Sequence, residues 1–377
     1  MAAYLDNSAT TKPCQQAVEA INRMLTQNFA NPSSLHGPGI EAAKEIIAAR
    51  QALANALSCE KEEIFFTSGA TEANNLALFG AAEAGRRRGN RIVISAIEHE
   101  SVLQAADELE KQGFEVVRLM PDEFGCVSAS DMAEAINEKT ILVSIMYINN
   151  EVGSIMPVEK IKKIVQMKNA PALVHIDCVQ AFGKVPVCPK KLGADLLSVT
   201  AHKIHGPKGC GALYIKKGVR IVPRVFGGEQ EKKIRPGTEA APLIAGFGAA
   251  VNALPDIKKQ SAEIAALNAY AKSKLLEIPG IKFNSGENAS PYILNVYIPT
   301  FMRSQTVVQE LSAEYGVYVS NGSACAKGKK SHVLAAMHLP DETADKSIRI
   351  SFSRESTAAD CDELCAAIKD LVNKHPR

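Results

Sequence analysis

The chain has 377 residues, of which 46% are hydrophobic and 22% charged, the balance of a globular protein large enough for about two domains. Its formal net charge of +2, with one short basic cluster at Arg86–Arg88, argues against a nucleic-acid partner, and we interpret that cluster as the solvated end of a helix. No apolar run approaches the roughly 20 residues that cross a membrane, and no signal peptide opens the sequence, so we expect a cytoplasmic protein.

The nine cysteines are scattered, odd in number and without a CxxC pair, a pattern that argues against a disulfide framework or a zinc ribbon. Cys361 and Cys365 lie one helical turn apart, but no further ligand accompanies them. We therefore expect a buried helix face there and no bound metal. Most of the remaining thiols should be small buried hydrophobes.

Between residues 63 and 215, short apolar runs typical of strands alternate with segments of helical period. This alternation predicts an α/β fold, with a mainly parallel seven-stranded sheet flanked by helices. The last two runs are too close for a helical crossover, so we expect them to be antiparallel neighbours joined by the turn 205–209. The runs are Glu63–Thr67, Arg91–Ser95, Glu115–Leu119, Ile141–Tyr147, Ala172–Asp177, Asp195–Val199 and Gly211–Ile215.

A long helical stretch follows, from about Ala240 to Ile278 and broken near Pro255. Beyond it, a smaller α+β region is expected, with strands near Ile293–Ile298, Val317–Val319 and Ile348–Phe352. We expect a large domain at 15–255 and a small domain formed by 1–14 together with 256–377. The cleft between the two is the expected site.

Polar side chains follow two of the first strands. The segment Thr67–Asn75 reads as strand end, small-residue turn and helix start, where backbone N–H groups and the Thr71 hydroxyl can hold a phosphate. The simpler interpretation is that Thr71 only caps the helix. His99 follows the run Arg91–Ser95, a place where an imidazole can stack on a planar ring.

Two further candidates lie at the ends of later strands. Asp177 is the C-terminal tip of an apolar run, with Gln180 three residues later. A carboxylate there can pair with a protonated pyridine nitrogen, although a helix N-cap is the alternative. Lys203 follows another run, among hydroxyl and imidazole groups. A lone lysine after a strand is usually a surface charge, so Lys203 gains meaning only beside the other features.

Taken in order and spacing, these features resemble the class V aminotransferase-like enzymes of pyridoxal-phosphate (PLP) fold type I, and more closely the NifS/IscS-like cysteine desulfurases. The resemblance covers almost the whole chain, from Leu5–Thr11 to Arg349–Arg354. It also includes Asn31–Ser34, Asn149–Gly153 and Ser320–Cys325. The resemblance implies an enzyme that removes sulfur from L-cysteine and releases L-alanine, with PLP bound to Lys203 as a Schiff base.

The resemblance also implies a role for each matching residue. Asp177 would pair with the ring nitrogen, His99 would stack on the ring and shuttle protons, and Gln180 would hydrogen-bond the phenolic oxygen. Asn150 would line the pocket beside ring and substrate. Arg354 would hold the substrate carboxylate with its bidentate guanidinium, a surface ion pair being the alternative. The phosphate would be held by Ala70, Thr71, Thr200, His202 and, from the neighbouring subunit of a homodimer with shared active sites, Thr238.

Cys325 selects the reaction, because the scaffold itself serves many PLP reactions. It lies in the small-residue segment 321–331, where exposure and the lysines at 327, 329 and 330 should favour a nucleophilic thiolate. The resemblance implies that Lys203 removes the α-proton of the bound cysteine. The Cys325 thiolate then attacks the sulfur, which leaves a persulfide on Cys325. A tolerated loop cysteine is the alternative.

The persulfide sulfur would pass to an acceptor protein that serves iron–sulfur cluster assembly or tRNA thiolation. The opening Asp6–Pro13 resembles Gram-positive-type members that feed tRNA thiolation, and no long tail of the housekeeping Isc type follows Arg377. Two other functions stay open. A selenocysteine or β-eliminating cysteine lyase would keep its turnover without Cys325. A non-enzymatic assembly protein with a decayed site would be colourless when purified.

Overall fold

The computed structural model describes residues 3–322 and 330–376 and has a seven-stranded sheet at its centre. The strand order is β2-β8-β7-β6-β5-β3-β4, and only β8 runs against its neighbours. The expected mainly parallel sheet is confirmed, as is the antiparallel pairing of its last two strands. The strands are β2 (Ile64–Thr67), β3 (Arg91–Ser95), β4 (Glu115–Leu119), β5 (Thr140–Met146), β6 (Leu173–Asp177), β7 (Leu196–Thr200) and β8 (Gly211–Ile215).

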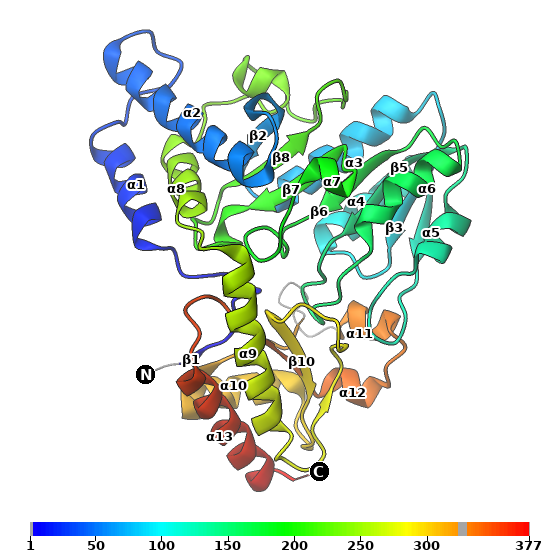
Figure 1. Cartoon of the computed structure of the whole chain (residues 1–377). Helices are drawn as coiled ribbons and strands as arrows, with labels where there is room; N and C mark the ends of the chain where they lie inside the picture. Colours follow the sequence, from blue (N-terminus) through cyan, green and yellow to red (C-terminus); the bar gives the residue numbers. More distant parts are fainter. Residues whose placement is uncertain (1–2, 323–329, 377) are drawn as a thin grey trace.

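The sheet is buried on both faces, which explains why its strands are nearly continuous apolar runs. Ile92 and Ile94 of β3 face one core together with α3 (Ala70–Gly85) and α4 (Glu100–Lys111). Val93, between them, faces the other core, because successive side chains of a strand point to opposite faces. That second face is covered by α5 (Ala129–Ala135), α6 (Ile161–Met167) and α7 (Pro189–Leu192) (Figure 1).

Two helices of the first sixty residues, α1 (Gln15–Thr26) and α2 (Gly37–Leu57), pack against α8 (Ala241–Asn252). Two glycines of α8 make this close approach possible. A Cβ at Gly248 would lie 2.6 Å from the Cα of Ala49 in α2, and one at Gly246 would lie 2.7 Å from the Ile21 side chain of α1. Short 3₁₀ turns complete this part of the chain at Lys61–Glu63, Val158–Lys160, Ala201–Lys203 and Gln230–Lys233.

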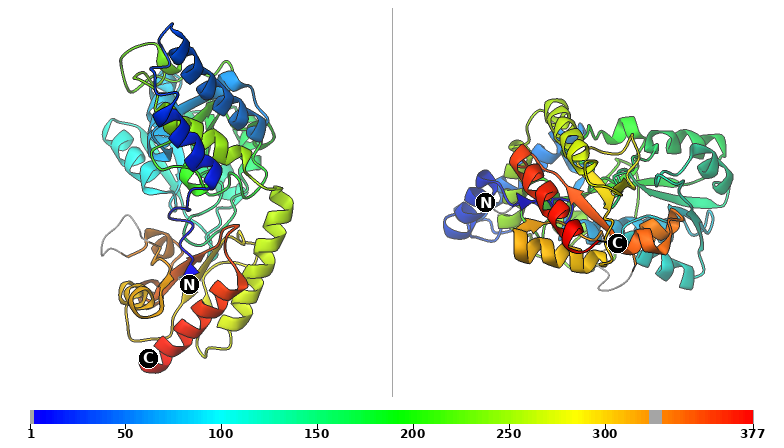
Figure 2. Two further views of the ribbon diagram at one scale, coloured as in Figure 1. Left: turned by 90° about the vertical axis from the view of Figure 1, so that its left-hand side faces the viewer. Right: turned by 90° about the horizontal axis from the view of Figure 1, so that it is seen from below.

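The helix α9 (Ile257–Leu275) leads from α8 to a second, three-stranded sheet of order β12-β10-β9 (Figures 1 and 2). The sequence predicts the interruption between α8 and α9 near Pro255. The short N-terminal strand β1 (Ala3–Tyr4) pairs with β11 (Val317–Tyr318), so the chain start joins this region. The elements are β9 (Lys282–Phe283), β10 (Ile293–Tyr297), α10 (Ser304–Tyr315), α11 (His332–Ala336), α12 (Asp341–Asp345), β12 (Ser347–Ser351) and α13 (Ala358–Lys374).

Helix α13 contains the two cysteines that are one turn apart. Cys361 and Cys365 are both buried, which agrees with the expected buried helix face. Within residues 3–322 and 330–376, no helix is long and apolar enough to span a membrane.

Candidate active site

The candidate residues meet at one edge of the large sheet. Strands β2, β3, β5, β6 and β7 run in the same direction, so their carboxyl ends lie at the same edge. Asp177 ends β6 and pairs in register with Ser198 of β7, five residues before Lys203. Helix α3 starts directly after β2, and α4 starts after β3. The strand register thus brings together residues that are more than 100 positions apart in sequence.

Lys203 closes the 3₁₀ turn that follows β7. Its Nζ donates to the carbonyl oxygen of Ala9 over 2.7 Å and also to the carbonyl oxygen of Ser8. The segment that carries these two carbonyls is itself held at the site, because the Thr11 N–H donates to the carbonyl of His202 over 2.9 Å. Lys203 is half-buried, and its amine is fixed by the N-terminal segment rather than turned to bulk water.

Asp177 is a buried carboxylate whose two oxygens accept hydrogen bonds from uncharged donors. Its Oδ2 accepts from Asn74 Nδ2 over 2.8 Å, and its Oδ1 accepts from the Val179 N–H over 2.9 Å. The second bond lies in a turn, because no helix starts between β6 and α7, so Asp177 is not the helix N-cap of the alternative interpretation. Because a buried negative charge is costly until a positive charge compensates it, Asp177 fits a protonated ring nitrogen.

His99 caps the start of α4. Its Nδ1 accepts from the Ser101 N–H over 3.1 Å and lies 2.9 Å from the Ser101 hydroxyl oxygen. Burial lowers the pKa of His99, although the nearby Asp177 opposes that effect. A neutral imidazole with Nδ1 occupied as acceptor carries its proton on Nε2, which leaves that atom to hold or move a proton.

Asn74 lies within the segment Thr67–Asn75, but the sequence alone predicts no role for it. It is fully buried, and its Nδ2 donates both to Asp177 Oδ2 and to Ser101 Oγ, each over 2.8 Å. Ser101 in turn contacts His99, so one amide group links Asp177 with His99. The signal available in the sequence was an asparagine inside an otherwise apolar helix, a place that this residue type rarely favours.

The start of α3 and the end of β7, where we expect the phosphate to bind, lie at the same edge of the sheet on either side of β8. Thr67 of β2 pairs with Gly211 of β8, and Gly211 pairs with Thr200 of β7. The N–H groups of Ala70 and Thr71 are in the first turn of α3, where no intrahelical acceptor exists, so they can receive an anion. The Thr200 hydroxyl donates to the Cys210 carbonyl over 3.1 Å.

His202 and Thr238 are the other two residues expected at the phosphate. The Nδ1 of His202 lies 3.3 Å from the Thr10 hydroxyl. Burial and then the nearby Lys203 lower the pKa of His202 to about 3, so it offers a neutral N–H rather than a charge. Thr238 is exposed, and its contact with a neighbouring subunit stays a prediction.

Arg354 and Lys203 line the same cavity. Arg354 donates from Nη1 to the Ala253 carbonyl over 2.7 Å, so it is held at the end of α8. Gln180 is buried, with Nε2 donating to the Ser8 carbonyl over 3.0 Å and Oε1 accepting from Lys184 Nζ over 2.8 Å. The positions of Arg354 and Gln180 agree with the prediction that both residues lie close to the Lys203 amine.

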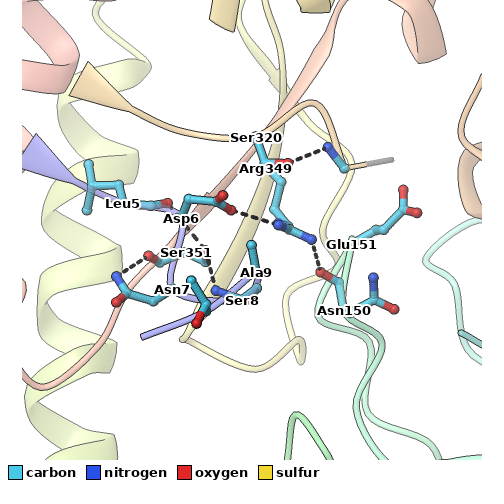
Figure 3. A network of polar contacts seen from close by, with 12 residues as sticks. Leu5, Asp6, Asn7, Ser8, Ala9, Asn150, Glu151, Ser320, Arg349 and Ser351 are labelled. Carbon is cyan, nitrogen blue, oxygen red and sulfur yellow. Dashed lines mark hydrogen bonds and ion pairs between the residues drawn. The ribbon is translucent and has the colours of Figure 1, made fainter. Parts of the chain in front are cut away.

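Cys325 lies outside the described residues, as do the lysines at 327 and 329. Residues on either side of that segment attach to the loop that holds Asn150. Ser320 exchanges backbone hydrogen bonds with Arg349, whose guanidinium donates to the Asn150 carbonyl over 2.9 Å and to Asp6 over 2.8 Å (Figure 3). On the far side, the Ser331 hydroxyl donates to Glu151 over 2.6 Å.

Of the three lysines in the segment 321–331, only Lys330 lies within the described residues. Lys330 forms an ion pair with Asp341 at 2.7 Å, and both side chains are largely exposed. This ion pair joins Lys330 to the first residue of α12.

The described residues fit the cofactor that the resemblance implies. Lys203 supplies an amine, Asp177 a buried carboxylate held by uncharged donors, and α3 a helix start suited to phosphate. His99 and Gln180 would lie beside the ring. No group of three or more histidine, cysteine or acidic residues in the described part of the chain is arranged to hold a metal ion.

Sequence and structure comparisons give a consistent set of similar proteins. Residues 3–364 match the family model described as Aminotransferase class-V. Cysteine desulfurase IscS of Methanosarcina thermophila is 42% identical over 377 residues, covering 99% of this chain and 92% of the relative. A solved NifS-like protein has a TM-score of 0.93 at 37% identity and covers 99% of this chain and 100% of its own. The solved structure "SspA in complex with cysteine" has a TM-score of 0.83 at 34% identity, covering 94% of this chain and 100% of that chain.

Proposed function

The chain belongs to the class-V aminotransferase family, among its NifS/IscS-like cysteine desulfurases, and we propose that it transfers the sulfur of L-cysteine to Cys325 and then to an acceptor protein. The protein is a pyridoxal-phosphate-dependent cysteine desulfurase. The observation that carries the site assignment is the meeting of Lys203, Asp177 and His99 at one edge of the sheet beside the start of α3.

When bound, PLP accepts electron density from the substrate bond that breaks. Asp177 would hold the ring nitrogen protonated and so strengthen this electron demand. Thr71, Thr200, His202 and the N–H of Ala70 would anchor the phosphate. The Lys203 amine would take the α-proton of the substrate, and Arg354 would orient the substrate carboxylate within reach of that amine.

Cys325 would complete the transfer. Its thiolate attacks the substrate sulfur, the carbon–sulfur bond breaks as the sulfur–sulfur bond forms, and the carbon receives a proton. Cysteine and one enzyme thiol thus become alanine and one enzyme persulfide, with no outside oxidant or reductant. The Nε2 of His99, which carries the proton of the neutral imidazole, is a suitable proton donor.

The first prediction concerns this transfer. Incubation of the yellow protein with L-cysteine should release one alanine per turnover and add the mass of one sulfur atom to the peptide that contains Cys325. The variant Cys325→Ser should lose at least about a hundredfold in alanine release, because the attacking group is gone. Mass spectrometry of the peptide and amino-acid analysis of the solution measure the two products.

Cys126→Ser is a matched control, because Cys126 is a partly exposed free thiol whose Sγ lies 3.5 Å from the Ile155 carbonyl, a residue without a role in the proposed site. It should leave both products unchanged. Alanine formation that continues in Cys325→Ser at the rate of the unmodified protein would contradict the proposal and point to a lyase. Release of pyruvate would point to β-elimination.

We also propose that the active protein is a homodimer in which Thr238 reaches the phosphate of the neighbouring subunit. Exposed apolar side chains on α1, α2 and the segment before the 3₁₀ turn Gln230–Lys233 support a subunit contact on that side.

The sulfur acceptor would be a tRNA-thiolation enzyme or an iron–sulfur scaffold. A reducing, cytoplasmic location agrees with the described cysteines, all of which are free thiols.

A further inference from the structure

Lys184 is a buried lysine in the turn that follows β6, with only 5% of its surface exposed. Its ammonium nitrogen donates to Gln180 Oε1 over 2.8 Å and lies 5.6 Å from the centroid of the Tyr292 ring. No carboxylate within residues 3–322 and 330–376 forms an ion pair with it. A methionine would fill the same space without the cost of burying a charge, so packing alone does not account for a lysine here.

The groups around the Lys184 ammonium are neutral or positive. Burial, and then the charges of Lys203 and Arg349, lower the pKa of Lys184 to about 7. Other groups near it are Tyr292, whose ring lies beside the ammonium, and four charged or titratable residues that share a pocket with Lys184 or lie within its electrostatic range, namely His202, His205, Lys258 and Arg354. Below about pH 7 this position therefore carries a positive charge that no carboxylate of the described residues neutralises.

The contact with Gln180 determines which end of that amide faces the site. In its protonated form Lys184 has donors only, so the atom 2.8 Å from it is then the amide oxygen. The Nε2 group then points the other way and donates to the Ser8 carbonyl over 3.0 Å. The same Ser8 carbonyl accepts from Lys203 Nζ, so the amide N–H₂ group and the Lys203 amine meet at one oxygen atom.

We propose that Lys184 is a positioning residue: it fixes the Gln180 side chain with its N–H₂ end toward Lys203 and adds a positive charge behind the cofactor. An amide nitrogen has two donors, of which the Ser8 carbonyl takes one. The other is then available for the phenolic oxygen of the cofactor, the role expected of Gln180. This inference rests on the proposed function, because it assumes that Lys203 carries the cofactor.

Loss of Lys184 has a defined consequence. Without the ammonium, the Gln180 amide is free to turn and present its oxygen, which cannot donate. A positive charge near Lys203 is also removed. Both changes favour the protonated form of the bound cofactor, so its pKa should rise.

The second prediction uses the visible absorbance of the bound cofactor. The visible absorbance of the bound cofactor changes with pH as the cofactor loses its proton. In the holoenzyme, Lys184→Met should raise the pKa of this change by about one unit. The same substitution should weaken equilibrium binding of PLP about tenfold. In a Gln180→Ala background, the same substitution should cause less than half of that shift, because Lys184 acts mainly through Gln180. Lys190→Met, on an exposed lysine of α7, should change neither quantity.

The outcomes separate this inference from the proposed function. If the unsubstituted protein binds PLP and forms alanine but Lys184→Met titrates identically, the positioning role is wrong. Equal shifts in both backgrounds would also overturn it. If the unsubstituted protein neither turns yellow with PLP nor forms alanine, the proposed function itself fails. Should Lys184→Met not fold, Lys184→Arg keeps the donor and the charge, and it must then restore the absorbance titration of the unsubstituted protein.

Discussion

Glu98 is a fully buried carboxyl group next to His99 in sequence. Its Oε1 accepts from the Ser95 hydroxyl over 2.5 Å and from the Met146 N–H over 2.9 Å, while its Oε2 has no partner within residues 3–322 and 330–376. Burial raises the pKa of Glu98 to about 8, and the nearby Asp177 adds to this effect. At neutral pH the folded protein therefore keeps Glu98 mostly protonated, which avoids a second negative charge beside Asp177.

The third prediction follows from this raised pKa. An unfolded chain loses the Glu98 proton near pH 4.5, whereas the folded protein holds it until about pH 8. The folded state binds more protons across that window, so the stabilisation is complete below pH 4.5 and is lost as the pH rises through 8. Glu98→Gln keeps the Oε1 acceptor and removes the titration. Relative to the unsubstituted protein, it should gain roughly 1–3 kcal/mol between pH 5 and pH 8.5.

Urea unfolding of both proteins at the two pH values measures this difference. Glu134→Gln, on an exposed glutamate of α5, is the control and should show no pH-dependent change. A Glu98→Gln difference that stays constant between pH 5 and pH 8.5 would show that Glu98 is ionised in the folded protein.

At this scale the sequence predicts residues that carry a motif and misses those that act through other residues. Asp177 and Lys203 were identified because each follows a strand within a recognisable order of motifs. Asn74 and Lys184 were not, because their importance comes from contacts with residues about 100 positions away or from burial in a turn. A lysine in a turn is ordinarily exposed, and no local sequence pattern predicts that Lys184 is buried.

Between elements, the link from α3 to α4 orders the site. Asn74 in α3 donates to Asp177 and to Ser101 in α4, and Ser101 holds His99. The fourth prediction is that Asn74→Ala weakens PLP binding about tenfold, because Asp177 and His99 each lose part of their support. Ser101→Ala should cost less, since it leaves the Asn74–Asp177 bond intact.

Fluorescence titration of the apoprotein with PLP gives both affinities. Asn252→Ala, on an exposed residue at the end of α8, is the control and should bind PLP normally. A larger loss in Ser101→Ala than in Asn74→Ala would show that the cofactor depends on the α4 cap and not on the link to Asp177.

The elements themselves divide into those that a periodic pattern reveals and those that it does not. The seven strands of the large sheet were predicted because burial on both faces makes each one a compact apolar run. The helix α2 was not assigned, since its alanine-rich sequence has little contrast between faces and opens with Gly-Pro-Gly. The strand β9 has only two residues and exists through its pairing with β10, which no local pattern encodes.

For the whole molecule, one side of the large sheet exposes apolar side chains that a single chain does not cover. Leu35 is 95% exposed, Phe226 85% and Phe29 76%. These residues lie on or beside α2 and the turn Gln230–Lys233, which are joined by the ion pair between Arg50 and Glu231 at 2.5 Å. Exposed apolar side chains of this size are typical of a surface that a second subunit covers, which supports the homodimer proposed above.

The fifth prediction is that this surface forms the homodimer. Sedimentation of the unsubstituted protein should give twice the 40.4 kDa mass of the chain, and the double variant Leu35→Asp with Phe226→Asp should give the mass of one chain. Phe301→Asp removes an equally large apolar group, 65% exposed, from the loop after β10, and it should remain a dimer. A dimeric double variant would place the subunit contact elsewhere.

Sharing of the active sites can be tested separately from dimer formation. Under the proposed function, Thr238→Ala and Lys203→Ala would each disable a site, the first by weakening the phosphate contact and the second by removing the amine. If Thr238 acts across the interface, a mixed dimer of the two variants contains one site with both an intact Lys203 and an intact Thr238. Mixed dimers should then recover tight PLP binding at one site per dimer. No recovery in confirmed mixed dimers would mean that Thr238 serves its own subunit, because each site would then carry one of the two defects.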